Sequence, residues 1–178
     1  MNTTWRLLLA LVIAVTISAC KTTEPETDTS ATDTTDTAPV VEEATTTAAP
    51  DPRDYTDARN FDNSESLLSK RVIYFDFDKS EVKAEYRAIV AAHASYVAAH
   101  RSARVTLEGH ADERGTREYN LGLGERRSNA ISGLLSAAGA MGSQLDSVSY
   151  GEERPVCRVS DENCWWQNRR VEIVYTAR

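Results

Sequence analysis

Residues 104–139 read RVTLEGHADERGTREYNLGLGERRSNAISGLLSAAG, and this stretch decides the fold. Val105 and Leu107 alternate with polar residues up to Gly109, which is the pattern of a strand with one buried face. Further on, apolar residues recur at helical spacing and stop at Gly139; they are Leu123, Ala130, Ile131, Leu134, Leu135 and Ala138. The stretch therefore predicts a strand, a polar loop and a helix with one apolar side.

The flanking sequence continues this alternation of strands and helices. The run Val72-Ile73-Tyr74-Phe75-Asp76-Phe77 predicts a strand that is covered on both faces. A helical stripe follows it, made of Val82, Tyr86, Ile89, Val90, His93, Tyr96 and Val97. A short strand at 148–150, a helical turn at 161–167 and a strand at 171–175 complete the pattern. We therefore expect an α/β fold in the order β-α-β-α-β-(α)-β, a sandwich whose helices pack on a mixed sheet.

Arg127 interrupts the apolar stripe of the second helix. It occupies a position where the pattern demands a buried side chain, and burying an unpaired guanidinium is too costly. The side chain is therefore expected either to reach solvent or to pair with a carboxylate. The candidate partners are Glu108, Asp112 and Glu125.

The loop between this strand and this helix, His110-Ala111-Asp112-Glu113-Arg114-Gly115, is a candidate binding site. Ligands of open α/β sheets bind beyond the carboxyl ends of the strands, and the glycines at 109 and 115 permit close backbone approach. Asp112 and Arg127 would then offer a carboxylate and a planar guanidinium to one pocket. Such a pair complements a zwitterion that carries an ammonium and a carboxylate on one carbon.

Other residues carry weaker signals. Asp78, just after the first strand, is well placed to cap the following helix. His110 and Asp112 form an H-x-D pair, but two ligands without a third do not predict a metal site, so we expect neither a metal nor a cofactor. A G-x-S-x-G motif does not occur, and we do not expect an enzyme.

Five blocks of sequence carry a resemblance to a known family. They are YFDFDKS at 74–80, GHADERGTREYN at 109–120, LGERR at 123–127, SYGEERP at 149–155 and QNRRV at 167–171. Together they closely resemble the peptidoglycan-associated lipoproteins, the Pal family, whose C-terminal domain is OmpA-like. The resemblance covers about residues 70–178.

This resemblance implies non-covalent binding of the diaminopimelate of peptidoglycan peptides. Matched position by position, Asp112 and Arg127 are the principal pair, Phe77 and Asp78 belong to the lining loop, and Leu123 supplies an apolar contact. The implied protein is a non-enzymatic link between outer membrane and cell wall, in a Tol-Pal-type system that acts in envelope integrity and cell division. The alternative is an interaction module whose main ligand is a Tol-type periplasmic partner such as a TolB-like protein.

The N-terminus predicts a signal peptide over residues 1–19. Arg6 precedes the apolar residues 7–15, a run shorter than the roughly 20 residues that span a bilayer. Ile17-Ser18-Ala19-Cys20 resembles the lipobox of bacterial lipoproteins. This implies acylation of Cys20 and, with Lys21 next to it, anchoring in the outer-membrane lipid bilayer with the domain facing the periplasm. An incidental small residue near the cleavage point is the alternative for Cys20.

Residues 20–69 are predicted to be the lipidated N-terminus and a disordered tether, and 70–178 the peptidoglycan-binding domain. Residues 21–52 contain eleven Thr and four of the five Pro, with one basic residue against eight acidic ones. This segment accounts for the formal net charge of −7, because residues 53–178 hold 18 basic and 19 acidic residues. A nearly neutral domain in an acidic chain argues against nucleic-acid binding.

Cys157 and Cys164 remain after Cys20 is assigned to lipidation. In an oxidising periplasm, two cysteines this close in a loop predict a disulfide. A redox-active pair is the alternative, although the spacing is not C-x-x-C.

Overall fold

The computed structural model describes residues 48–178. The predicted signal peptide, the lipidation site at Cys20 and most of the predicted tether lie outside the described residues. Among the helices of residues 48–178, none is both long and apolar enough to cross a membrane.

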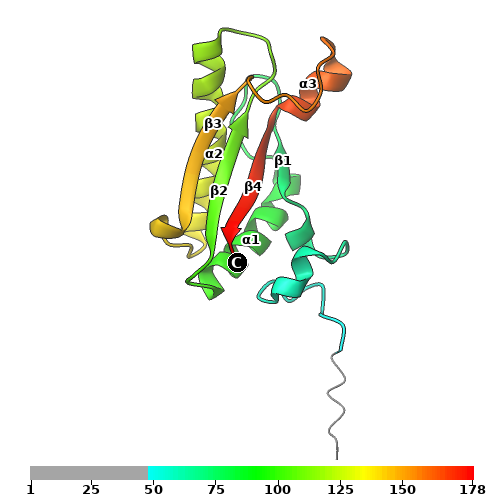
Figure 1. Ribbon diagram of the computed structural model, residues 1–178, viewed down its shortest axis with the longest axis vertical. Helices are drawn as coiled ribbons and strands as arrows, with labels where there is room; N and C mark the ends of the chain where they lie inside the picture. Colours follow the sequence, from blue (N-terminus) through cyan, green and yellow to red (C-terminus); the bar gives the residue numbers. More distant parts are fainter. Residues whose placement is uncertain (1–47) are drawn as a thin grey trace, which may run out of the picture. The chain divides into compact units, whose positions relative to one another are not determined.

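Four strands form one mixed sheet in the order β1-β4-β2-β3 (Figure 1). They are β1 (Val72–Tyr74), β2 (Arg104–His110), β3 (Leu145–Gly151) and β4 (Arg170–Ala177). β4 runs antiparallel to both β1 and β2, whereas β2 and β3 are parallel. The two long helices, α1 (Arg87–Ala99) and α2 (Arg117–Ala137), lie behind the sheet in Figure 1. The predicted fold class and element order are confirmed.

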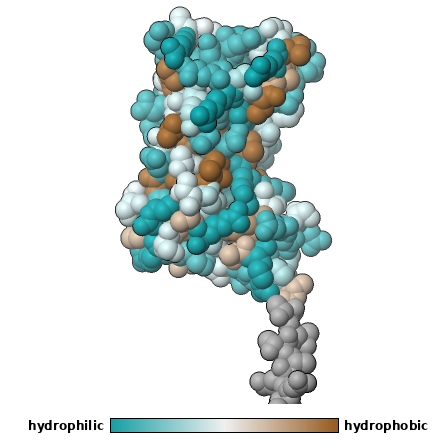
Figure 2. Space-filling model, in the orientation of Figure 1, coloured by the Kyte–Doolittle hydropathy of each residue, from teal (hydrophilic) through white to brown (hydrophobic). Residues whose placement is uncertain are grey.

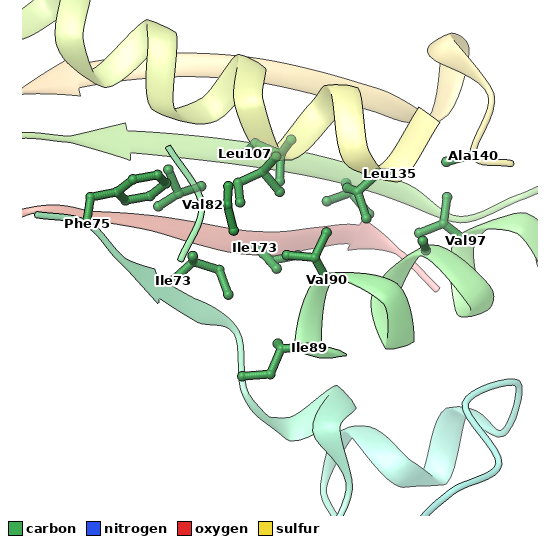
Figure 3. Close-up of a cluster of buried hydrophobic side chains, with 14 residues drawn as sticks. Ile73, Phe75, Val82, Ile89, Val90, Val97, Leu107, Leu135, Ala140 and Ile173 are labelled. Atoms are coloured by element: carbon green, nitrogen blue, oxygen red, sulfur yellow. The ribbon is translucent and has the colours of Figure 1, made fainter. Parts of the chain in front are cut away.

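The core lies between the sheet and these two helices (Figure 3). The sheet contributes Ile73, Leu107 and Ile173, and the helices contribute Val90, Val97 and Leu135. The predicted alternation in β2 is correct, because Val105 and Leu107 are buried while Arg104 is exposed. The opposite face of the sheet is turned to the viewer in Figure 1, and polar surface dominates it in Figure 2, with apolar residues scattered through it.

Several elements have bounds other than those suggested by the sequence pattern: β3 covers Leu145–Gly151 rather than 148–150, and two further differences lie next to the cavity described below. β1 ends at Tyr74 rather than Phe77, because the chain turns at Asp76, whose carbonyl accepts a hydrogen bond from the Lys79 N–H. α2 begins at Arg117, well before its first predicted apolar position, because the Thr116 side chain caps it. Most of the first turn of α2 faces away from the core, so apolar periodicity cannot reveal it.

The C-terminal end of the predicted tether must be corrected, because residues 55–69 pack on the domain. Two short 3-10 helices, η1 (Ala58–Phe61) and η2 (Leu67–Ser69), bury Phe61 and Leu68. The Phe61 ring packs edge-on against Tyr96 of α1 and Tyr175 of β4, with ring centroids 4.7 and 4.6 Å apart. These contacts form a second apolar cluster beside the main core. They supply the burial that the segment cannot generate within its own sequence.

Candidate functional site

Two glycines bring α2 directly onto the sheet. A Cβ on Gly109 would overlap the backbone carbonyl of Gly124, and a Cβ on Gly124 would overlap the Ser149 hydroxyl. The helix therefore approaches β2 more closely than side chains would allow. This contact sets Arg127, almost one turn beyond Gly124, beside the loop that follows β2.

A cavity of about 200 Å³ opens at this end of the sheet, the end at which α3 (Glu162–Asn168) also lies in Figure 1. Its lining residues are Phe77, Asp78, Asp112, Arg114, Gly115, Tyr119, Leu123 and Arg127. The structure thus brings together all five residues predicted to bind the ligand. They come from the β1–α1 loop, the β2–α2 loop and α2, which meet where β2 ends.

Arg127 is fully buried and is held by backbone carbonyls. Its Nε donates to the Lys79 oxygen at 2.8 Å, its Nη1 to the His110 oxygen at 2.7 Å and its Nη2 to the Asp76 oxygen at 3.0 Å. The expectation of a solvent-exposed or carboxylate-paired side chain is therefore wrong. Burial lowers the pKa of Arg127 to about 10, which still leaves the group charged at neutral pH. A guanidinium has five N–H donors, so two remain for a ligand.

Asp112 is a buried carboxylate that accepts four N–H groups. Three belong to Arg114, whose backbone N, Nε and Nη2 lie 3.1, 3.2 and 2.7 Å from its oxygens. The fourth is Nη1 of Arg169, at 3.2 Å. Burial opposes ionisation, but these hydrogen bonds outweigh it and lower the pKa of Asp112. The acceptor positions of a carboxylate number about four, so all are occupied.

Asp78 stands at the rim of the cavity in a strained backbone conformation. It has a φ of +55°, in the left-handed region that non-glycine residues rarely adopt. One carboxylate oxygen accepts the Tyr119 hydroxyl, and the described residues leave the other oxygen without a hydrogen bond. Asp78 caps no helix, because η3 (Ala84–Tyr86) leads into α1 and has Lys83 as its N-cap. Such strain is characteristic of functional sites.

Sequence reasoning missed Arg114 and Tyr119 as members of this site. Both lie in the quoted GHADERGTREYN block, but neither interrupts a hydrophobic pattern. The detectable signal for Arg114 is its position two residues after Asp112, which favours the side chain-to-backbone turn that the structure contains. With Arg114 included, two carboxylates and two guanidiniums surround the cavity.

The H-x-D pair does not converge on one point. Asp112 lines the cavity, whereas His110 is absent from its lining and has Nε2 4.0 Å from a Glu172 oxygen. Within residues 48–178, no group of three His, Cys, Asp or Glu side chains could hold a metal ion.

The structure joins Cys157 and Cys164 by a disulfide. Cys164 belongs to α3 and is buried, and the bridge closes the segment that leads from β3 into this helix. The pair thus lies at the same end of the sheet as the cavity, although neither cysteine lines it.

Comparison with known proteins gives consistent matches. Residues 74–168 match the OmpA family. The peptidoglycan-associated lipoprotein of Pseudomonas putida is 51% identical over 108 residues, which are 61% of this chain and 64% of that protein. The match thus spans less than two thirds of that relative. The Haemophilus influenzae lipoprotein of the same name is 46% identical over 58% of this chain and 67% of its own length. The crystal structure of the peptidoglycan-associated lipoprotein from Burkholderia pseudomallei is similar with a TM-score of 0.64 and 42% identity, covering 65% of this chain and 98% of that one.

Proposed function

Because the chain belongs to the OmpA family, we propose that its domain binds peptidoglycan non-covalently through the zwitterionic side-chain end of diaminopimelate. The observation that carries this proposal is the cavity at the end of β2, where two carboxylates and two guanidiniums face one small volume. A ligand group with one positive and one negative charge on the same carbon complements this arrangement.

Each end of the zwitterion has a partner with free hydrogen-bonding capacity. We assign the carboxylate to Arg127, which retains two N–H donors after binding three carbonyls. We assign the ammonium to the region between Asp78 and Asp112. Asp78 supplies the free oxygen, and Asp112, whose oxygens already accept four N–H groups, contributes its charge. Phe77 and Leu123 line the same cavity and offer apolar contact to the methylene chain of the ligand.

The relatives named as peptidoglycan-associated lipoproteins support a wider proposal. We place the chain in the Gram-negative envelope as a non-enzymatic lipoprotein, anchored in the outer membrane by acylated Cys20, with the domain facing the periplasm. In this setting it links the membrane to the cell wall and associates with TolB-like and other Tol-type proteins.

The test is a titration of the purified protein with a peptide that contains meso-diaminopimelate, together with co-sedimentation with sacculi. Asp78→Asn and Asp112→Asn are each expected to weaken binding about tenfold or more, which corresponds to about 1.4 kcal/mol. The matched control is Asp146→Asn, an exposed carboxylate on β3 outside the cavity lining. Binding by both site variants at the affinity of the wild type would overturn the proposal.

The ligand itself provides the second arm of the test. Peptides in which the side-chain carboxylate is amidated, or in which lysine replaces diaminopimelate, lack the group assigned to Arg127. Both are expected to bind at least about tenfold more weakly. Equal affinity for all three peptides would overturn the assignment of the ligand carboxylate to Arg127, whereas binding of none of them would favour the alternative of an interaction module whose ligand is a Tol-type protein.

A further inference from the structure

Arg114 lies between two aromatic rings. Its guanidinium carbon is 4.0 Å from the centroid of the Phe77 ring and 4.1 Å from that of the Trp165 ring. A planar guanidinium stacks well on aromatic faces, and each contact stabilises the position of the charge. Phe77 belongs to the cavity lining, whereas Trp165 reaches Arg114 from α3.

Trp165 is itself held by a directed contact. Its indole Nε1 donates to an oxygen of Glu113 at 3.0 Å, and Glu113 is the residue between Asp112 and Arg114. Glu162, one turn before Trp165 on the same helix, adds an ion pair, with Oε2 3.5 Å from Nη2 of Arg114. One face of α3 thus contacts the β2–α2 loop around Arg114.

The Cys157–Cys164 disulfide is one of the tertiary contacts that hold α3 in place. A helix of seven residues is too short to be stable alone, so its placement must come from tertiary contacts. The Cys157–Cys164 bridge supplies one, because Cys164 immediately precedes Trp165. Asn168 supplies another: its side-chain oxygen accepts the backbone N–H groups of Val156 and Cys157, at 2.9 and 3.1 Å.

We propose that Trp165 is a positioning residue of the diaminopimelate cavity: it holds Arg114 against Asp112, and the disulfide-closed segment holds Trp165. This inference rests on the proposed function. Without the indole, the Arg114 guanidinium loses the aromatic ring on one of its faces, and its hydrogen bonds to Asp112 become less ordered. The cavity then loses its ordered arrangement of charge, and ligand binding must restore it at a cost in affinity.

The test is a double-mutant cycle of Trp165→Leu and Arg114→Ala, measured by titration with the peptide that contains meso-diaminopimelate. Trp165→Leu is expected to bind about tenfold more weakly, within the range of a partly desolvated cation–π contact. In the Arg114→Ala background the same substitution is expected to have almost no further effect, because Trp165 acts through Arg114. Trp165→Phe, which keeps an aromatic face, should recover most of the affinity.

The matched control is the neighbouring tryptophan. Trp166 is 45% exposed and packs edge-on against Tyr74, outside the cavity lining, so Trp166→Leu should bind as the wild type does. A double substitution of Cys157 and Cys164 by serine should weaken binding in the same Arg114-dependent manner as Trp165→Leu.

The outcomes separate the two proposals. A wild type that does not bind the peptide refutes the proposed function, and the positioning role with it. A wild type that binds, with Trp165→Leu binding equally tightly, refutes the positioning role alone. Fully additive effects of Trp165→Leu and Arg114→Ala also refute it, since they would show that Trp165 acts independently of Arg114.

Discussion

Replacing Arg127 with methionine should destabilise the domain as well as disturb the ligand site. The guanidinium donates to the carbonyls of Asp76 and Lys79 in the β1–α1 loop and to that of His110, the last residue of β2. A hydrogen bond from a charged donor contributes about 1.5–3 kcal/mol, so three contribute about 5–9 kcal/mol before the cost of burying the charge. That cost is several kcal/mol, which methionine avoids. We expect a net loss of about 3 kcal/mol in the free energy of unfolding.

Urea denaturation followed by circular dichroism measures this loss directly. With a slope of about 2 kcal/mol per molar urea, the midpoint should fall by about 1.5 M. Arg126→Met is the control, because Arg126 is exposed on the same helix and should change stability by less than about 0.5 kcal/mol. A loss below about 1 kcal/mol for Arg127→Met would show that the three carbonyls do not depend on this side chain, and the account of Arg127 would be wrong.

Two further predictions concern the packing around the site and the second apolar cluster. Gly109→Ala should lower the free energy of unfolding by about 3 kcal/mol or more, because its Cβ meets the Gly124 backbone. Gly133→Ala should raise it by about 0.5–1 kcal/mol, because open space surrounds its Cβ. Equal effects of the two substitutions in urea titrations would contradict this account. Burial lowers the pKa of His93 from 6.5 to about 4, so between these pH values the unfolded state binds more protons than the folded state. The contribution of His93 to stability is therefore fully present above pH 6.5 and is lost toward pH 4, a decrease of about 3 kcal/mol. His93→Gln should remove most of this decline, and superimposable pH profiles of the two proteins would refute it.

The elements and their buried faces follow from local pattern. Strand and helix place side chains at fixed periods, so the alternation around Val105 and Leu107 was enough to assign the buried face of β2. The expected topology also predicted that Asp112 and Arg127 line one cavity, because the residues that follow a strand and the helix that packs on it meet at the same edge of the sheet. Gly139, predicted from the sequence as the C-terminal stop of this helix, follows the end of α2 with a positive φ of +106°.

The partners of these side chains were decided only by the tertiary structure. Arg127 binds carbonyls 17, 48 and 51 residues away, and every residue carries such a carbonyl, so no residue type marks them in the sequence. Asp112 is likewise shared by Arg114 and by Arg169, 57 residues away on the far side of the disulfide segment. Phe61 and Leu68 have no periodic neighbours, and their burial comes from surfaces that exist only once α1 and β4 have assembled. Periodicity determines which face of an element is buried, whereas long-range contacts determine what that face meets.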